Sequence, residues 1–491
     1  MFQPVSNQVD FAAQENEVLA FWKRTGAFDR LRQLLATSEK RYSFIDGPIT
    51  ANNPMGVHHA WGRTYKDLWQ RYKAMLGYNQ RWQNGFDCQG LWVEVNVEKE
   101  LGFKSKRDIE EYGMTRFIAL CKERVLKSAA TQTDQTIRLG NWMDWNDTDE
   151  LRMLAAEIVK DPQKHITLKR GDKEVHGTVE QLVGQLGMPD LQGSYFTFSD
   201  ENNYQIWSFL KKCYENGWVY RGTDSIPWCP RCGTGISQHE IDTEGYKDRE
   251  DYTITARFRL KTLDTKNVAW QNDGAEKFAA TPNRYLLAWT TTPWTLPANV
   301  MAAVGPKMTY VLAMQTHKDG EQAIYILSKG TQKMLKGEFE VLGEMIGADL
   351  AGATYQGIFD DLPAWIDANK TWADKHGFED DRIFEHCVIP WDEVGEDEGT
   401  GIVHIAPGCG PEDHQLGKLH SSPMVGPLDE EGNYLPNFGE FSGKFAHDVP
   451  EQVANALKKK GYFYKHDKYV HRYAHCWRCG SPLVYRLVGE W

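Results

Sequence analysis

Residues 42–138 combine short apolar runs with helical periodicity. Residues 42–46 are predicted to form a strand, followed by a turn over 47–56. Apolar side chains then recur at helical spacing, which predicts a helix; they are Trp61, Tyr65, Leu68, Trp69, Tyr72, Met75 and Leu76. A second strand is predicted to begin at residues 80–82, which indicates one βαβ unit of a nucleotide-binding sheet, and a long helix is predicted over 108–138.

The pattern changes after residue 147. Residues 148–192 are predicted to contain a helix, a hairpin around Gly171 and Asp172, and a second helix, which we interpret as a small insertion. A further helix is predicted over 204–214. Beyond Pro227, short alternating runs separated by turn residues predict a β-rich domain.

Composition indicates a globular protein of two or three domains. The chain has 491 residues, of which 41% are hydrophobic and 25% charged, and its 18 Trp, 21 Tyr and 21 Phe argue against disorder. No apolar run reaches the roughly 18 residues of a membrane span, and the polar, then amphipathic opening does not indicate a secretory signal. The nine Cys, four of them in CxxC pairs, favour reduced thiols, so a cytoplasmic enzyme is expected.

The formal net charge of −12 does not indicate a nucleic-acid-binding protein. Lys104, Lys106 and Arg107 form only a weak basic cluster, of the kind common on solvated faces. Contact with a polyanion would therefore have to use local patches.

The turn between the first strand and helix carries candidate chemistry. A strand-to-helix turn directs backbone N–H groups and the positive end of a helix dipole at one point, which suits phosphate. His58 and His59 lie there as donors that can stabilise charge on a triphosphate. Paired His residues at a helix start are more often ordinary surface or core residues, so this signal alone is moderate.

The same stretch resembles the first signature of class I aminoacyl-tRNA synthetases through Pro48, Asn52 and the Lys66-Asp67 pair. The usual isoleucine-family sequence is His-x-Gly-His, whereas this chain has Gly56-Val57-His58-His59. The resemblance implies that ATP, with Mg²⁺, is bound at this turn and that the two His residues are catalytic; the implied binding residues are Gly47, Pro48, Asn52, Gly56 and Asp87. We hypothesise that Gly56 makes room for His58, which takes over the phosphate role and changes the fit of adenylate analogues.

A second string, residues 85–102, is similar to the family segment after the second strand. Asp87 matches the acid that holds the amino group of the substrate, a charge-assisted contact suited to an ammonium. Gln89 replaces the usual His.

Two CxxC pairs, each followed by Gly, suit a closed tetrahedral zinc site. They are Cys229, Cys232, Cys476 and Cys479. Spacing alone does not establish that the pairs meet, and two separate redox pairs are the alternative. In the resembled family these positions flank a large insertion, so a structural Zn²⁺ at its neck is implied.

Residues 289–299, Trp-Thr-Thr-Thr-Pro-Trp-Thr-Leu-Pro-Ala-Asn, closely resemble the threonine-rich peptide of isoleucyl-tRNA synthetase editing domains. By composition alone, a Thr run is merely a good strand former. A second string, residues 399–413, resembles the other editing motif, in which Asp413 is the acid that accepts the substrate amino group. The implied editing residues are Thr290, Thr291, Thr292, Thr295, Asn299, His404 and Asp413, with Thr291 and Asp413 catalytic. Ile405 and Cys409 depart from the usual Thr and His.

The resemblance implies an α/β fold, in which an incomplete Rossmann-like nucleotide-binding fold carries a large inserted, β-rich, barrel-like editing domain. The expected domains are 1–203, with the small insertion at 148–192; 204–480, the editing domain with its zinc neck; and 481–491, the start of the return. The implied activity is isoleucine–tRNA ligation with hydrolysis of mischarged Val-tRNA-Ile. Partners would be tRNA-Ile, isoleucine and ATP, and a cytoplasmic monomer without membrane contact is expected.

The second activation signature, Lys-Met-Ser-Lys-Ser, is absent from the sequence, and no anticodon-binding helical domain is recognised. We therefore interpret the chain as a fragment in which full aminoacylation is not expected. Two alternatives stay open: a stand-alone aminoacyl-tRNA deacylase, and a non-catalytic zinc-stapled tRNA-binding module.

Overall fold

The computed structural model describes residues 8–44, 46–317, 320–379 and 382–491. The chain divides into two compact units, Met1–Val219 and Tyr220–Trp491. The sequence-based boundary between residues 203 and 204 falls inside a helix, α9, of the first unit. The polar opening, residues 1–7, and Ile45 of the predicted first strand lie outside the described residues.

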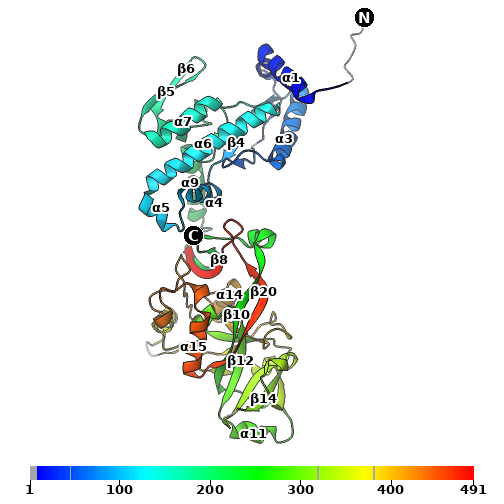
Figure 1. The fold of residues 1–491 in the computed structure, drawn as a ribbon, viewed down its shortest axis with the longest axis vertical. Coiled ribbons are helices and arrows are strands. Elements are labelled where there is room, and N and C mark those ends of the chain that lie inside the picture. Colours follow the sequence, from blue (N-terminus) through cyan, green and yellow to red (C-terminus); the bar gives the residue numbers. More distant parts are fainter. Residues whose placement is uncertain (1–7, 45, 318–319, 380–381) are drawn as a thin grey trace. The chain divides into compact units, whose positions relative to one another are not determined.

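The first unit is an α/β assembly with two small parallel sheets (Figure 1). Its elements are α1 (Phe11–Thr25), α2 (Ala27–Leu35), β1 (Arg41–Tyr42), β2 (Ile49–Thr50), α3 (Val57–Met75), β3 (Asn79–Gln80), β4 (Gly85–Asp87), α4 (Leu91–Leu101), α5 (Arg107–Tyr112), α6 (Met114–Arg138), α7 (Thr148–Lys160), β5 (His165–Arg170), β6 (Lys173–Thr178), α8 (Val179–Gly184), β7 (Tyr195–Phe196) and α9 (Asp200–Glu215). β1 pairs with β3, and β2 and β7 flank β4.

The predicted βαβ unit corresponds to β1–α3–β3, in which β1 pairs in parallel with β3. Its first strand comprises only Arg41–Tyr42, and a further strand, β2, lies within the predicted turn 47–56. The predicted helix 108–138 is instead two helices, because Gly113 between α5 and α6 has φ 102°, which ends the first helix. The hairpin and the two helices of residues 148–192 are confirmed as β5–β6, α7 and α8. A buried apolar cluster joins α6, α7 and α8 to β4 and β7.

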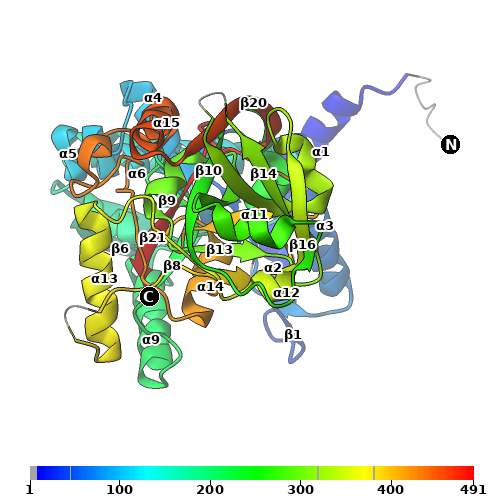
Figure 2. The same ribbon diagram turned by 90° about the horizontal axis from the view of Figure 1, so that it is seen from below.

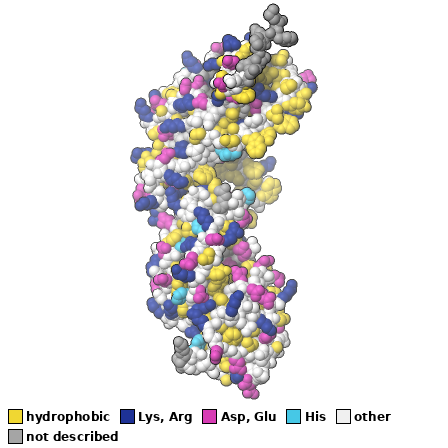
Figure 3. Space-filling view, turned by 45° about the vertical axis from the view of Figure 1, so that its right-hand side comes forward, with side chains coloured by type: hydrophobic (Ala, Val, Ile, Leu, Met, Phe, Trp, Pro, Cys, Tyr) yellow, Lys and Arg dark blue, Asp and Glu magenta, His cyan; other side chains and the backbone are white. Residues whose placement is uncertain are grey.

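Several apolar side chains of the first unit remain exposed (Figure 3). They include Trp61, Tyr65 and Trp69 on α3 and Tyr204, Trp207 and Phe209 on α9. Apolar groups gathered in this way are typical of surfaces that contact further protein.

The second unit is built on a curled β-sheet. Its elements are β8 (Gly222–Cys229), β9 (Thr234–Gly235), α10 (Gln238–Glu240), the π-helix η1 (Ile241–Gly245), β10 (Tyr246–Thr262), β11 (Ala269–Trp270), α11 (Gly274–Ala280), β12 (Arg284–Thr290), the 3₁₀ helix η2 (Pro293–Ala298), β13 (Met301–Val304), β14 (Thr309–Thr316), β15 (Gln322–Ser328), the 3₁₀ helix η3 (Lys329–Met334), β16 (Glu340–Ile346), α12 (Gly347–Leu350), β17 (Thr354–Tyr355), α13 (Pro363–His376), β18 (Val388–Pro390), β19 (Ile402–Ile405), α14 (Pro411–Leu419), the 3₁₀ helices η4 (Gly439–Phe441) and η5 (Ala446–Asp448), α15 (Pro450–Lys460), β20 (Phe463–Ala474) and β21 (Val484–Glu490).

The strands run in the order β11-β16-β14-β15-β12-β10-β17, with β20 also paired to β10, and they wrap rather than lie flat (Figure 2). A smaller sheet, β18-β13-β19, packs into the same core. The predicted β-rich region and the α/β fold class are confirmed. β21, predicted to begin a return to the first domain, pairs with β8 inside this unit.

Candidate active sites and metal centre

The nucleotide turn is the segment 47–56, for which the sequence predicts phosphate binding. It includes β2 and directly precedes α3 in the first unit. Gly56 is the N-cap of α3, and the N–H of Gly56 donates a hydrogen bond to Nδ1 of His59, 3.1 Å away. Partial burial, then the neighbouring His58, lowers the pKa of His59. A neutral His59 that accepts at Nδ1 carries its proton on Nε2, so it can donate to a ligand from that atom.

His58 is exposed, and its ring lies 3.8 Å from that of His59. A Cβ placed on Gly56 would lie 3.0 Å from Cε1 of His58, tighter than ordinary contacts. This geometry supports the hypothesis that Gly56 makes room for His58.

Of the Lys-Asp pair of the signature, Lys66 contacts the start of the turn, whereas Asp67 bonds elsewhere in the first unit. Lys66 forms an ion pair with the buried Asp46 and donates to Gly47 O at 3.1 Å. Asp67 accepts from Arg71 and from the N–H of Trp142. The carboxylates of Asp46 and Asp67 both therefore form contacts within the protein.

Asp87 lies at the end of β4 beside the turn. It accepts from the hydroxyl of Thr50 at Oδ2, 2.9 Å away, and its side chain is half-buried. Gln89 donates to Asn203 of α9. Pro48 and Asn52, also predicted, flank Thr50, and the N–H of Asn52 donates to Thr50 O. Thus the predicted nucleotide-site residues cluster around one turn.

A cavity of about 420 Å³ in the second unit brings the two predicted editing strings together. One wall carries the threonine peptide, which leaves β12 and enters η2; the other carries β19 and the start of α14. The predicted residues in its lining are Thr290, Thr291, Thr292, Thr295, His404 and Asp413. Trp391 and Tyr485, which the sequence analysis did not single out, also line it.

Hydrogen bonds fix the orientations of the Thr290 hydroxyl and the Asp413 carboxyl group. The Thr290 hydroxyl accepts from the N–H of Thr292 at 3.0 Å. Asp413, in the first turn of α14, accepts from the N–H of Ala406 at 2.8 Å. Its carboxyl opens on the cavity but is otherwise surrounded by protein, and this burial raises its pKa to about 7. A carboxyl group with this pKa is present in both ionisation states near pH 7, in a cavity that threonine hydroxyls and further acidic side chains also line.

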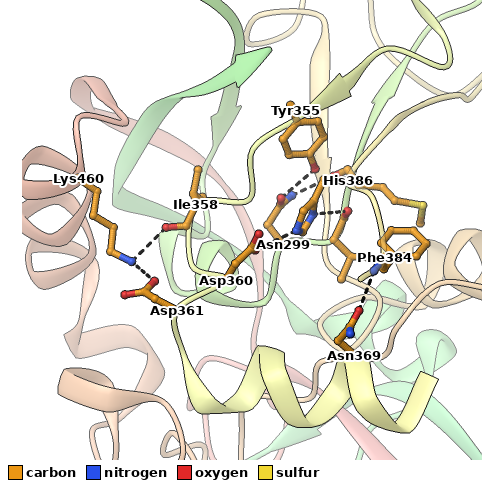
Figure 4. A network of polar contacts seen from close by, with 11 residues as sticks. Asn299, Tyr355, Ile358, Asp360, Asp361, Asn369, Phe384, His386 and Lys460 are labelled. Atoms are coloured by element: carbon orange, nitrogen blue, oxygen red, sulfur yellow. Dashed lines mark hydrogen bonds and ion pairs between the residues drawn. The ribbon is translucent and has the colours of Figure 1, made fainter. Parts of the chain in front are cut away.

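Asn299 does not line this cavity. Its side chain belongs to a buried polar network (Figure 4), in which it accepts from the Tyr355 hydroxyl at 2.9 Å and donates to Met301 O at 2.9 Å. In the same network His386 contacts Val300 O at 2.7 Å and Asp360 at 2.9 Å. Sequence reasoning missed His386, because a lone His carries no local signal of such a role.

The two cysteine pairs meet in the second unit, although 244 residues separate Cys232 from Cys476. The four Sγ atoms lie within 4.8 Å of one another, with Cys229–Cys479 at 3.5 Å and Cys232–Cys476 at 3.9 Å. Sulfurs bound tetrahedrally to zinc at about 2.3 Å lie about 3.8 Å apart, so these residues fit such a metal. The antiparallel pairing of β8 with β21 brings the knuckles together, and Glu240 braces one by accepting from Trp477 and Arg478.

A sequence model of the family described as "tRNA synthetases class I (I, L, M and V)" matches residues 17–161 and 163–484. The chain belongs to this family. This class I synthetase chain is 33% identical over 483 residues to an isoleucine–tRNA ligase of Pyrococcus horikoshii, which covers 97% of this chain and 38% of that protein. It is 33% identical over 505 residues to that of Treponema denticola, which covers 100% of this chain and 40% of that protein.

The class I synthetase chain thus spans about two fifths of the length of these relatives. Among solved structures, it is similar to a P. knowlesi cytosolic leucyl-tRNA synthetase editing domain at 12% identity and a TM-score of 0.31, with 45% of this chain and 97% of that chain covered. Across the part of the synthetase chain that the structure describes, none of the helices is both long and apolar enough to cross a membrane.

Proposed function

We propose that this chain supplies the adenylate-forming turn and the ester-hydrolysing pocket of an isoleucine–tRNA ligase. The observation that carries the proposal is the cavity in which Thr290–Thr292 face Asp413. Similarity to isoleucine–tRNA ligases along nearly the whole chain supports isoleucine as the amino acid. Residues 204–480 would be the inserted domain of a cytoplasmic monomer, with 1–203 the first part of the nucleotide fold and 481–491 the start of its return.

The activation step would use ATP, Mg²⁺ and isoleucine at the turn of the first unit. His58 and the Nε2–H of His59 would donate to phosphate oxygens, and Gly47, Pro48, Asn52 and Gly56 would shape the turn. Asp87 would hold the isoleucine ammonium. Mg²⁺ would neutralise phosphate charge when bound. Transfer of the activated isoleucine to tRNA-Ile would follow.

Hydrolytic editing is needed because binding in the activation site discriminates poorly between isoleucine and valine. Isoleucine and valine differ by one methylene, which in isoleucine-activating enzymes themselves is worth only about 1–3 kcal/mol. In the second pocket Asp413 would hold the ammonium of valine, and Thr291 with its neighbouring hydroxyls would orient the terminal ribose and a water. The water adds to the ester carbonyl, the bond to the ribose oxygen breaks, and free valine and intact tRNA leave.

We propose that Cys229, Cys232, Cys476 and Cys479 hold one structural Zn²⁺. The Sγ separations fit a tetrahedral thiolate site. All four ligand positions are filled by protein, which leaves none for a substrate. The metal would tie together chain segments at both ends of the second unit.

Hydrolysis of Val-tRNA-Ile by residues 1–491 tests the editing part of the proposal. We expect release of valine by the wild-type chain and loss of release in Asp413→Ala, whereas Asp374→Ala, which removes an exposed acid of α13, should match the wild type. All cavity residues lie in the second unit, so the stand-alone deacylase is the second candidate. Binding of tRNA without turnover, unchanged by Asp413→Ala, would instead favour the non-catalytic module.

A further inference from the structure

Helix α6 presents two glutamines to the backbone of the nucleotide turn. Gln132 Nε2 donates to Thr50 O at 3.1 Å and to Asn53 O at 2.8 Å. Gln135, almost one helical turn further on, accepts from the N–H of Met55 at Oε1, 2.7 Å away. Gln135 Nε2 also donates to Met55 O over a longer distance of 3.5 Å. Gln132 therefore contacts the turn through its donors, whereas the short contact of Gln135 is made through its acceptor.

The same face of α6 also contacts the helix that follows the turn. The Thr136 hydroxyl accepts from Arg63 Nη1 at 2.7 Å and donates to Gln132 O at 2.6 Å. Arg63 lies one helical turn after His59 on α3, and Arg63, Gln132 and Thr136 are all buried. One helix face thus contacts both the turn and the helix that carries the two His residues.

We propose that Gln132 is a positioning residue for nucleotide binding, which sets the backbone orientation of the turn. This proposal rests on the proposed function of the turn. A backbone that binds phosphate must direct N–H groups toward the anion and carbonyl oxygens away from it. By donating to the carbonyls of Thr50 and Asn53, Gln132 turns the negative ends of two peptide dipoles toward α6.

The burial of Gln132 supports a role for its donors. Among the described residues, its own Oε1 has no hydrogen-bond partner although it is buried. A buried amide oxygen without a partner is unfavourable, so an apolar side chain would serve simple packing better. Apolar packing is already supplied in this region by a buried cluster that includes Ala51, Leu126 and Ala129. The amide is thus explained by the two carbonyls that it contacts.

Matched charge substitutions separate this role from packing. Gln132→Glu removes both donated bonds and places a carboxylate against two carbonyl oxygens. Gln135→Glu introduces the same charge almost one turn away, at a half-buried position. It keeps the acceptor for the N–H of Met55 and loses only the longer 3.5 Å bond to Met55 O. Hydrogen exchange of the peptide 49–56 in residues 1–491 is the first measurement. We expect exchange about 10-fold faster in Gln132→Glu and near wild type in Gln135→Glu, because the first loses its bonds of 3.1 and 2.8 Å whereas the second keeps its bond of 2.7 Å.

The pH dependence gives a second signature. Once protonated, the carboxyl group introduced by Gln132→Glu again carries an O–H that can donate to a carbonyl. The ratio of variant to wild-type exchange should therefore fall toward one as the pH is lowered, which loss of packing would not produce. Equal defects in both Glu variants, or no defect in either, would overturn the proposal. If Gln132→Glu does not fold, Gln132→Met, which lacks donors at similar length, must show the exchange defect instead; wild-type exchange in that variant would overturn it.

Calorimetric measurement of ATP binding in the presence of Mg²⁺ tests whether Gln132 influences nucleotide binding. We expect the Kd to rise about 10-fold in Gln132→Glu and at most about 2-fold in Gln135→Glu. If the wild-type chain does not bind ATP, the proposed function fails for this chain, while the exchange comparison still decides whether Gln132 sets the turn. Faster exchange with an unchanged ATP Kd would refute the positioning role.

Discussion

The imidazole of His404 and the hydroxyl of Thr295 form a hydrogen bond of 2.7 Å in the wall of the cavity of the second unit. The single hydroxyl proton of Thr295 is donated to Thr292 O at 2.8 Å, so the hydroxyl accepts from Nε2–H of His404. Burial lowers the pKa of His404 to about 4, and the ring is neutral at pH 7. Its unprotonated Nδ1 is buried and without a partner among the described residues.

Thr295→Val should destabilise the second unit, because it leaves the buried Nε2–H of His404 without an acceptor. The expected loss in the free energy of unfolding is about 1–3 kcal/mol, measured by urea denaturation. Thr295→Ser keeps the hydroxyl and should lose much less. Equal stability of the Val variant and the wild type would contradict the assigned tautomer.

Hydrolysis of Val-tRNA-Ile should depend on the ionisation of Asp413. Its pKa is raised to about 7 by burial, and only the carboxylate attracts an ammonium. The rate should therefore rise between about pH 6 and pH 8 with a midpoint near the Asp413 pKa, in single-turnover assays. A rate that is flat across this range, or unchanged in Asp413→Asn, would exclude Asp413 as the ammonium partner.

The same pKa has a consequence for stability with the opposite pH trend. A carboxyl whose folded pKa lies above its unfolded value favours folding in its protonated form, so stability falls as pH rises from about 4 to about 7. Asp413→Asn should then be more stable than the wild type at pH 8, by up to about 4 kcal/mol from some three pKa units, and similar to it at pH 4. Urea denaturation at the two pH values measures both differences.

Purified chain should contain one zinc per molecule if the four-cysteine site is a structural centre. Cys229→Ala or strong chelation should remove the metal and lower the thermal midpoint of the second unit, because the knuckles would lose their common ligand. Elemental analysis with calorimetry measures both effects. Cys213→Ala removes a buried thiol of α9 and should retain the metal. Zinc content unchanged by Cys229→Ala would rule out this site.

The altered signature predicts a specific epistasis. Gly56→His alone should weaken binding of ATP by about 10-fold or more, since its Cβ would meet His58 at 3.0 Å. Adding His58→Gly should relieve the clash and change the affinity for a non-hydrolysable isoleucyl-adenylate analogue. Calorimetric Kd values for both ligands test this. An unchanged analogue Kd in the double variant would reject the hypothesis that His58 has taken over the phosphate role.

Asn299 should matter for stability through its position in the polar network rather than through contact with substrate. Asn299→Asp places a carboxylate oxygen against Met301 O and removes a buried donor, at an expected cost of about 1–3 kcal/mol in unfolding free energy. Surviving folded protein should keep its apparent affinity for Val-tRNA. A weakened affinity without loss of stability would indicate direct substrate contact.

Local pattern was enough to predict much of the chain. Helical spacing predicted α3, the alternation around Gly171 predicted the β5–β6 hairpin, and the short alternating runs beyond Pro227 predicted a β-rich region. These features depend on backbone preferences and on which face of an element is apolar, and both are written in neighbouring residues. The break at Gly113 was missed, because the apolar pattern continues on both sides of a single residue with positive φ.

The sequence by itself determined the family, the chemical groups available and the local elements that carry them. Tertiary structure alone decided that Cys229 lies beside Cys479, that His404 bonds Thr295, and that Asn299 belongs to a buried polar network instead of the cavity lining. It also decided that Gln132 contacts a turn some 80 residues earlier in the chain. Such pairings depend on strand order and core packing, which arise from interactions among distant parts of the chain and leave no periodic signal along it.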